Sequence, residues 1–148
     1  MRNARVRLAA RIAAVEAFRE ERDRQKLAVA RHESTMADVA LTKAELAWRG
    51  IEEERAVALA VHHDLARYVL WGDLAAHACD VHALATTKAI HAEEMAAKAS
   101  QHWADARVRA DATQDRAEHV EREDTAAVDA RSFADAVDLW LSRARRPA

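Results

Sequence analysis

Glycine and proline are almost absent from this sequence, and no other feature limits its fold as strongly. Its 148 residues include two glycines, Gly50 and Gly72, and one proline, Pro147. A sheet-based domain needs turn residues at about every 8–12 positions, and an α/β domain needs glycines where strands meet helices. The sequence supplies neither, so it predicts an all-α protein.

Alanine makes up about a quarter of the chain, with 38 residues. It favours helix formation but buries little apolar area when it packs. Large apolar side chains are few in comparison. We therefore expect a thin, closely packed seam between helices rather than a globular core.

The position of Gly72 indicates where the chain reverses. Gly72 lies near the midpoint and precedes Asp73, a residue type that caps a new helix. We predict a single domain over residues 1–148, a long antiparallel two-helix coiled-coil hairpin with helices over 3–70 and 74–144 and a turn over 71–73. Gly50 lies within a regular spacing, so we expect the first helix to continue through it, straight or mildly kinked, at a cost of about 1 kcal/mol relative to alanine.

Small and apolar residues recur every three or four positions in both arms, as in a helix that packs along one face. In the first arm the series contains Leu8, Ile12 and Val15, and then Leu41, Ala44, Trp48, Ile51, Arg55, Ala58, His62, Leu65 and Val69. In the second arm it contains Leu74, His77, Val81, Leu84, Lys88, His91 and Met95, then, after a shift of one, Trp103, Ala106, Ala110, Thr113, Ala117, Val120, Asp124 and Ala127, and finally Ala134, Val137 and Leu141. The period near 3.5 predicts a left-handed supercoil.

Charge differs between the two ends of the chain. Residues 1–31 carry nine basic and four acidic side chains, a net charge of +5, and residues 111–141 carry nine acidic and three basic ones, a net charge of −6. An antiparallel hairpin that turns near Gly72 brings these segments together, with a stabilisation of ~0.5 kcal/mol per pair. The net charge of the whole chain is only −2, which gives no indication of a nucleic-acid partner.

Several features indicate a cytoplasmic protein without membrane insertion. The single cysteine, Cys79, cannot form an intramolecular disulfide and suits a reducing compartment. No apolar run approaches the length of a membrane span. Arg11 and Glu16 interrupt the apolar core that a signal peptide would need.

Histidines near the predicted turn are the strongest candidates for chemistry. His62, His63, His77 and His82 lie there together with Cys79, and such side chains can bind zinc. The spacings of zinc motifs and of di-iron bundles are absent. We expect polar residues that flank a coiled coil, and no metal or other cofactor.

No pattern indicates catalysis. The serines lack a glycine-rich elbow, a phosphate-binding loop needs several glycines, and a two-helix structure offers little concavity for a pocket. We therefore expect a protein that is not an enzyme.

Two surfaces are candidates for binding partners. At the predicted open end, arginines oppose the helix dipole at the N-terminus, which suggests an external anionic partner, and an ordinary solvated basic end is the open alternative. This end combines Arg2, Arg5, Arg7 and Arg11 with Arg143, Arg145 and Arg146, accompanied by Leu8, Ile12, Trp140 and Leu141. At the predicted tip, large apolar residues either close the tip or bind a partner, namely Tyr68, Val69, Leu70, Trp71 and Leu74.

An arginine-rich helical N-terminus, two equal helical arms, a midpoint turn and a basic C-terminus that contains Trp140 occur together in this chain. The N-terminal part of the pattern is Arg2, Arg5, Arg7, Leu8 and Arg11. In this architecture the chain resembles the stalk subunits of type III export, the FliJ-type proteins of flagella and the YscO- and Hrp-type proteins of injectisomes. The resemblance spans the whole chain and rests on architecture, since the family has no strict motif.

The resemblance implies a non-enzymatic stalk or adaptor whose paired ends enter the central opening of a hexameric export ATPase. The ATP chemistry would belong to that partner. The implied ring-contact set is Arg5, Leu8, Arg11, Ile12, Trp140, Leu141 and Arg143. The opposite tip would contact the export gate or secretion chaperones, and the implied tip-contact set is Tyr68, Val69, Leu70, Trp71 and Leu74.

Other interpretations of the sequence remain open. One is a structural alanine-rich coiled coil, a scaffold or a phasin-like protein that coats a hydrophobic surface. A less favoured one is a helical bundle with a histidine-liganded metal. A homodimer that forms a four-helix assembly is also compatible, because the predicted two-helix seam is thin.

Overall fold

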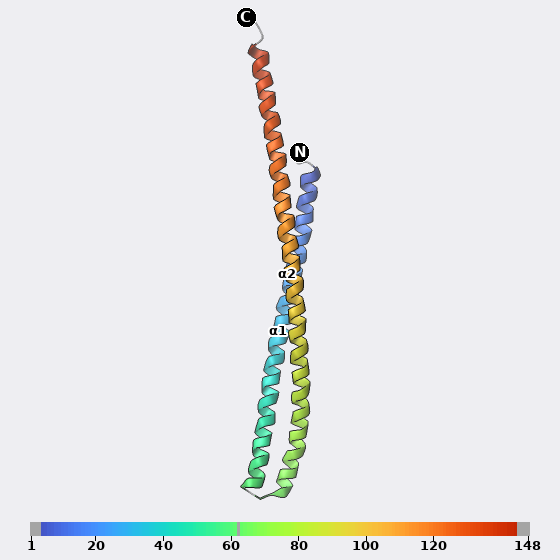
Figure 1. The fold of residues 1–148 in the computed structure, drawn as a ribbon, viewed down its shortest axis with the longest axis vertical. Coiled ribbons are helices and arrows are strands. Elements are labelled where there is room, and N and C mark those ends of the chain that lie inside the picture. The colour runs from blue at the N-terminus through green and yellow to red at the C-terminus, as the bar shows by residue number, and fades with distance from the viewer. Residues whose placement is uncertain (1–3, 62, 145–148) are drawn as a thin grey trace. The chain divides into compact units, whose positions relative to one another are not determined.

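The computed structural model describes residues 4–61 and 63–144 of the chain. Two helices account for nearly all of them, α1 (Ala4–Ala60) and α2 (Leu65–Ala144) (Figure 1). These ranges contain no strand. The all-α helical hairpin predicted from the sequence is confirmed, and α1 passes through Gly50 without a break.

The chain reverses at residues 61–64, so the prediction of a turn at 71–73 was wrong. Gly72 and Asp73 lie inside α2. Two features end α1 and start α2 without glycine. His63 adopts a left-handed backbone conformation with φ of 51°, a region that few residues other than glycine visit. Asp64 then caps α2, since its Oδ1 accepts a hydrogen bond of 3.0 Å from the backbone N–H of Arg67.

Gly72 lies beside Arg55 of α1 and forms no turn. A Cβ atom at this position would lie 3.4 Å from Nη2 of Arg55 on α1. The guanidinium of Arg55 stacks over the ring of Tyr68 at 4.6 Å and lies 3.6 Å from the carboxylate of Glu52. A Cβ here would make an ordinary van der Waals contact with that guanidinium. The cation–π contact between Arg55 and Tyr68 joins α1 to the first turn of α2.

The chain divides into two compact units, each built from one part of α1 and one part of α2. The terminal unit consists of Met1–Arg22 and Ala104–Ala148, and the turn unit of Asp23–Trp103. In the turn unit the buried apolar residues are Leu27, Ala44, Ala58, Ala75, Ala78 and Ala89. In the terminal unit they are Val6, Ala13, Ala106 and Val120.

Alanine fills most of the buried positions, which follows from the close approach of the helices. The sequence predicts Leu8, Ile12 and Val15 for the seam, but all three are exposed and the buried residues beside them are Val6 and Ala13. From Leu74 to Met95 the predicted series is also on the wrong face, since Ala75, Ala78 and Ala89 are the buried residues. The prediction holds for Leu41 to Ala58 and for Trp103 to Asp124, whose residues are buried or half-buried. It was wrong for the later members of both series, since Leu65, Val69, Ala127, Ala134, Val137 and Leu141 are exposed.

Within the terminal unit, α2 continues beyond the N-terminal end of α1 (Figure 1). Arg5 of α1 lies beside Glu123 of α2, with 3.3 Å between Nη2 and Oε2. Every residue from 125 to 144 is exposed, although this stretch remains helical throughout. We call residues 125–144 the C-terminal segment. The earlier position of the turn explains it, because the arms of the hairpin are 57 and 80 residues long and not equal.

Candidate functional site

A shallow groove lies between α1 and α2 in the terminal unit, with a volume of about 320 Å³. Its apolar members from α1 are Leu8 and Ile12, which are 59% and 47% exposed. Thr113, Arg116 and Val120 of α2 complete its wall, and Arg5 closes one end through its ion pair with Glu123. The groove is therefore an apolar strip between basic side chains, at the position of three members of the ring-contact set.

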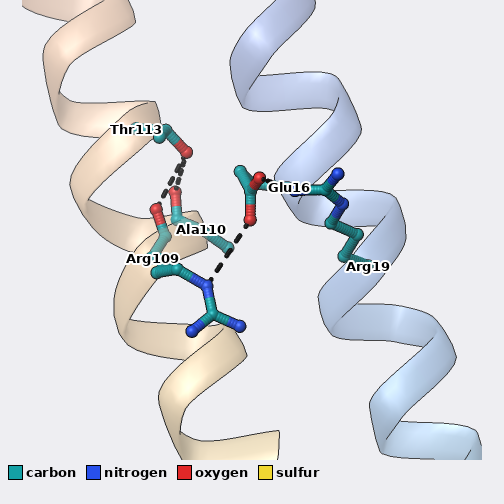
Figure 2. Close-up of polar contacts among 5 residues, drawn as sticks. All are labelled: Glu16, Arg19, Arg109, Ala110 and Thr113. Atoms are coloured by element: carbon teal, nitrogen blue, oxygen red, sulfur yellow. Dashed lines mark hydrogen bonds and ion pairs between the residues drawn. The ribbon is translucent and has the colours of Figure 1, made fainter.

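Next to this groove the two helices are joined by a carboxylate. Figure 2 shows Glu16 of α1 between Arg19 on its own helix and Arg109 on α2. The distances from the carboxylate are 2.6 Å to Nη1 of Arg19 and 3.7 Å to Nε of Arg109, and the Glu16 side chain is only 13% exposed. On the same turn of α2 the hydroxyl of Thr113 donates to the backbone carbonyls of Arg109 and Ala110 (Figure 2). Of these contacts, the ion pair between Glu16 and Arg109 joins α1 to α2 in the terminal unit, and the others lie within one helix.

The C-terminal segment carries three of the four remaining members of the ring-contact set, Trp140, Leu141 and Arg143. The fourth, Arg11, is an exposed residue of α1 that does not line the groove. The sequence places them beside Arg5 and Arg11 at an open end where both termini meet. The structure pairs Arg5 with Glu123 instead. Trp140 lies 17 residues further along α2, about 26 Å at the rise of an α-helix. The predicted convergence of Arg5 with Arg143 was therefore wrong, and the described members of the set lie partly on α1 beside the groove and partly on the C-terminal segment. Arg2, Arg145 and Arg146 lie outside the residues that the structure describes.

Large apolar side chains on the C-terminal segment have no partner on α1. Phe133 and Trp140 are the most exposed, at 73% and 68%. Val128, Val137, Leu139 and Leu141 are also exposed. Exposed apolar groups gathered on one stretch of a helix are typical of a surface that binds another protein.

The tip-contact set occupies the first turns of α2, close to the chain reversal. Tyr68 and Trp71 are half-buried, whereas Val69, Leu70 and Leu74 are exposed. Further exposed apolar side chains lie around the same turn, on Val57, Leu59, Val61 and Leu65. The apolar groups at the turn therefore do not close completely over one another.

The histidines near the turn do not gather. His82 packs against Trp48, with ring centroids 5.3 Å apart, and Cys79 is an exposed free thiol. His62 lies outside the residues that the structure describes. Over residues 4–61 and 63–144, no group of three or more His, Cys, Asp or Glu side chains is placed to hold a metal ion.

The described part of either helix also lacks a stretch of the length and apolarity needed to cross a membrane. Comparisons with family models, with curated protein sequences and with solved structures gave no match for this chain.

The C-terminal segment as a separate surface was not predicted, although the sequence contains a signal for it. The seam that packs on α1 runs through Val120 to Asp124. Continued at the same spacing, it would place Arg131 and Asp138 at core positions. Charged residues therefore recur at the a positions of α2 beyond the stretch that packs on α1.

Proposed function

We propose that this chain is a non-enzymatic helical stalk or adaptor that binds the hexameric ATPase of a bacterial type III secretion or flagellar export apparatus in the cytoplasm. The observation that carries this proposal is the C-terminal segment. It is a helix of 20 residues, exposed throughout, with large apolar side chains and a basic residue, Arg143, near its end. A ring with a central opening is a partner into which an unpaired helix can insert.

The groove of the terminal unit supports the same partner. Leu8 and Ile12 offer apolar contact area, and Arg5 and Arg11 add positive charge beside it. Such a surface suits acidic and apolar side chains on the inner wall of a ring. The stalk would then bias ring assembly or the catalytic states of the ATPase, while the partner performs the hydrolysis.

The turn would serve as the second contact. The exposed residues Val69, Leu70 and Leu74 and the half-buried Tyr68 and Trp71 would bind the export gate or secretion chaperones. This second contact is compatible with the ring contact, because the two contacts use residues of different units.

The test is the ATPase activity and the oligomeric state of the purified export ATPase with and without the chain. We expect faster hydrolysis or easier hexamer formation with the chain present. Arg11→Glu should weaken both effects, and Arg31→Glu, the same change at an exposed position in the turn unit, should not. Arg5→Glu is less informative, because it would also set two carboxylates against each other at Glu123. An ATPase that responds to neither the chain nor the substitution would refute the proposal.

A specific observation also favours a second candidate, an alanine-rich scaffold or a phasin-like coat. Large apolar side chains are exposed in both units, for example Leu46 and Leu84 in the turn unit and Phe18 in the terminal unit. A helix pair that buries alanines and exposes leucines can adsorb to a hydrophobic surface. Adsorption to lipid vesicles or polymer granules without any stimulation of an export ATPase would favour this function over the stalk.

A further inference from the structure

The C-terminal segment has a heptad pattern of its own. Apolar residues occupy each position of a spacing that alternates three and four residues, the pattern of the a and d positions of a coiled coil. The a positions are Ala130, Val137 and Ala144, and the d positions are Ala126, Phe133 and Trp140. All six residues are exposed, so the segment is a coiled-coil strand without a partner in the single chain.

This heptad does not continue the seam that binds α1. In the seam, the a positions run through Ala110, Ala117 and Asp124, and the next two would be Arg131 and Asp138. The new pattern starts one residue earlier, at Ala130, which turns the apolar face by about 100° around the helix. A longer α1 would therefore meet Arg131 and Asp138 at the a positions, together with Ala127, Ala134 and Leu141 at the d positions. The face that contains Phe133 and Trp140 points away from this seam and suits a different helix.

We propose that this face binds the same segment of a second copy of the chain, in an antiparallel two-helix coiled coil. In the antiparallel arrangement each a residue lies opposite a d residue of the partner. Ala130 then faces the partner subunit's Trp140, and Val137 faces the partner subunit's Phe133. The largest side chain thus meets a small one, and the outermost layers pair Ala126 with Ala144. A parallel dimer would instead stack Trp140 on its own copy and leave three alanine layers underpacked, one of them, Ala130, in the interior of the contact.

Charge supports the antiparallel direction independently. Asp129 and Arg143 occupy g positions, which flank the core. In the antiparallel pairing Asp129 faces Arg143 of the partner subunit, and the two-fold symmetry forms this pair twice. A parallel dimer would place Asp129 next to Ala134 and form neither pair.

The dimer uses only residues of this chain and stands whether or not the proposed function does. It covers Trp140 and Arg143, which the ATPase ring would also contact. Dimer and ring-bound chain would then exclude each other, and only this consequence rests on the proposed function. The free protein would keep its apolar segment covered until the ring displaces the second copy.

The first test is sedimentation equilibrium of the full chain between about 1 and 200 µM. We expect a monomer–dimer equilibrium with a dissociation constant on the order of micromolar, because the contact spans fewer than three heptads. Trp140→Ala should weaken association by about 100-fold or more. Val128→Ala, an exposed apolar residue on the opposite face of the same segment, should leave it unchanged. Circular dichroism checks that the helices of both variants remain.

The second test determines the direction of pairing. Asp129→Arg and Arg143→Asp should each weaken self-association by about tenfold, since each creates two like-charge contacts per dimer. An equimolar mixture of the two variants should associate about as tightly as the unchanged chain, because the heterodimer regains both opposite-charge pairs. This design needs no apolar substitution, so loss of packing cannot produce the result.

A monomer at all these concentrations would overturn the proposal, as would a dimer indifferent to Trp140→Ala. A mixture that associates no more tightly than its components would overturn the antiparallel arrangement. None of these measurements includes the ATPase, so failure of the dimer leaves the stalk proposal intact, and failure of ATPase binding leaves the dimer intact.

Discussion

Residues 104–124 and 125–144 of α2 belong to one helix of the terminal unit but differ in what their apolar faces contact. The first stretch packs on α1 through small side chains, with Ala106 fully buried. The second has no residue of α1 beside it, carries larger apolar side chains and is exposed throughout. In the terminal unit the residues buried between the helices are alanine and valine, and the larger apolar side chains of residues 125–144 are exposed.

The difference follows from the geometry of close helix packing. Two helices that approach through alanines leave no space for leucine or isoleucine between their backbones. Leu8 and Ile12 therefore lie beside the seam and not in it. The segment without a partner has no such restriction, and it holds Phe133, Val137 and Trp140 on one face.

A proline substitution in each stretch should give the largest difference in stability between them. Val108 and Val128 are both exposed residues of α2, at 68% and 54%. Val108→Pro should lower the free energy of unfolding by about 3 kcal/mol, because it disrupts a helix whose pairing stabilises the terminal unit. Val128→Pro should reduce the helical signal but leave the denaturation midpoint unchanged. Urea denaturation followed by circular dichroism measures both, and equal destabilisation would show that the second stretch also contributes to the hairpin.

Hydrogen exchange of the backbone amides tests the comparison residue by residue. In the Trp140→Ala variant, which keeps the segment unpaired, amides of residues 125–144 should exchange at least about 100-fold faster than those of 104–124. An unpaired helix of this length is marginal in water and opens locally, whereas the paired stretch opens only with the hairpin. Mass spectrometry or NMR gives the rates. Similar protection in the two stretches would contradict the assignment.

Replacing alanine by leucine should lower the free energy of unfolding in the stretch that packs on α1 and leave it nearly unchanged in the stretch without a partner. Ala106→Leu should destabilise the chain by about 2 kcal/mol, because the added atoms force the helices apart. Ala127→Leu, at an exposed position, should change stability by less than about 0.5 kcal/mol. Both are measured by urea denaturation at low protein concentration, where dimers dissociate. If Ala106→Leu left the free energy of unfolding unchanged, the two helices could not be closely packed at this position.

Removal of one charged group should give the smallest difference in stability between the two stretches. Glu16→Gln should cost about 1 kcal/mol, because the largely buried carboxylate accepts contacts from Arg19 and Arg109. Asp129→Asn should have no effect on the stability of the monomer, since its position is exposed. Thermal denaturation at low and high salt separates the cases, and the effect at Glu16 should persist partly at high salt because that side chain is shielded from solvent.

The fold class was predictable from composition, but the position of the turn was not. Scarce glycine and proline and abundant alanine favour helices locally, and this propensity needs no tertiary information. The turn was assigned to Gly72 because glycine is the strongest breaker of helices. The chain instead reverses at His63 and Asp64, where the capping carboxylate of Asp64 gave a signal of the same kind as Asp73.

This shift of the turn changed the candidate site. With the turn at Gly72, Arg5 would lie close to Arg143, and the two basic ends would form one surface. With the turn at residues 61–64, Arg5 meets Glu123, and the segment that contains Trp140 and Arg143 remains unpaired. A shift of a few residues at the turn moves the opposite helix by about twice as many, because both arms change length.

The amino-acid sequence was enough to predict a pair of long helices, since helix propensity and the spacing of apolar residues depend only on residues close together in the chain. It also contained the heptad of residues 126–144, which is a local pattern. Only the tertiary structure decided which residues face each other across the hairpin, which side of each helix is buried and where α2 loses its partner. Those properties depend on contacts between residues far apart in the chain, and a single turn sets all of them together.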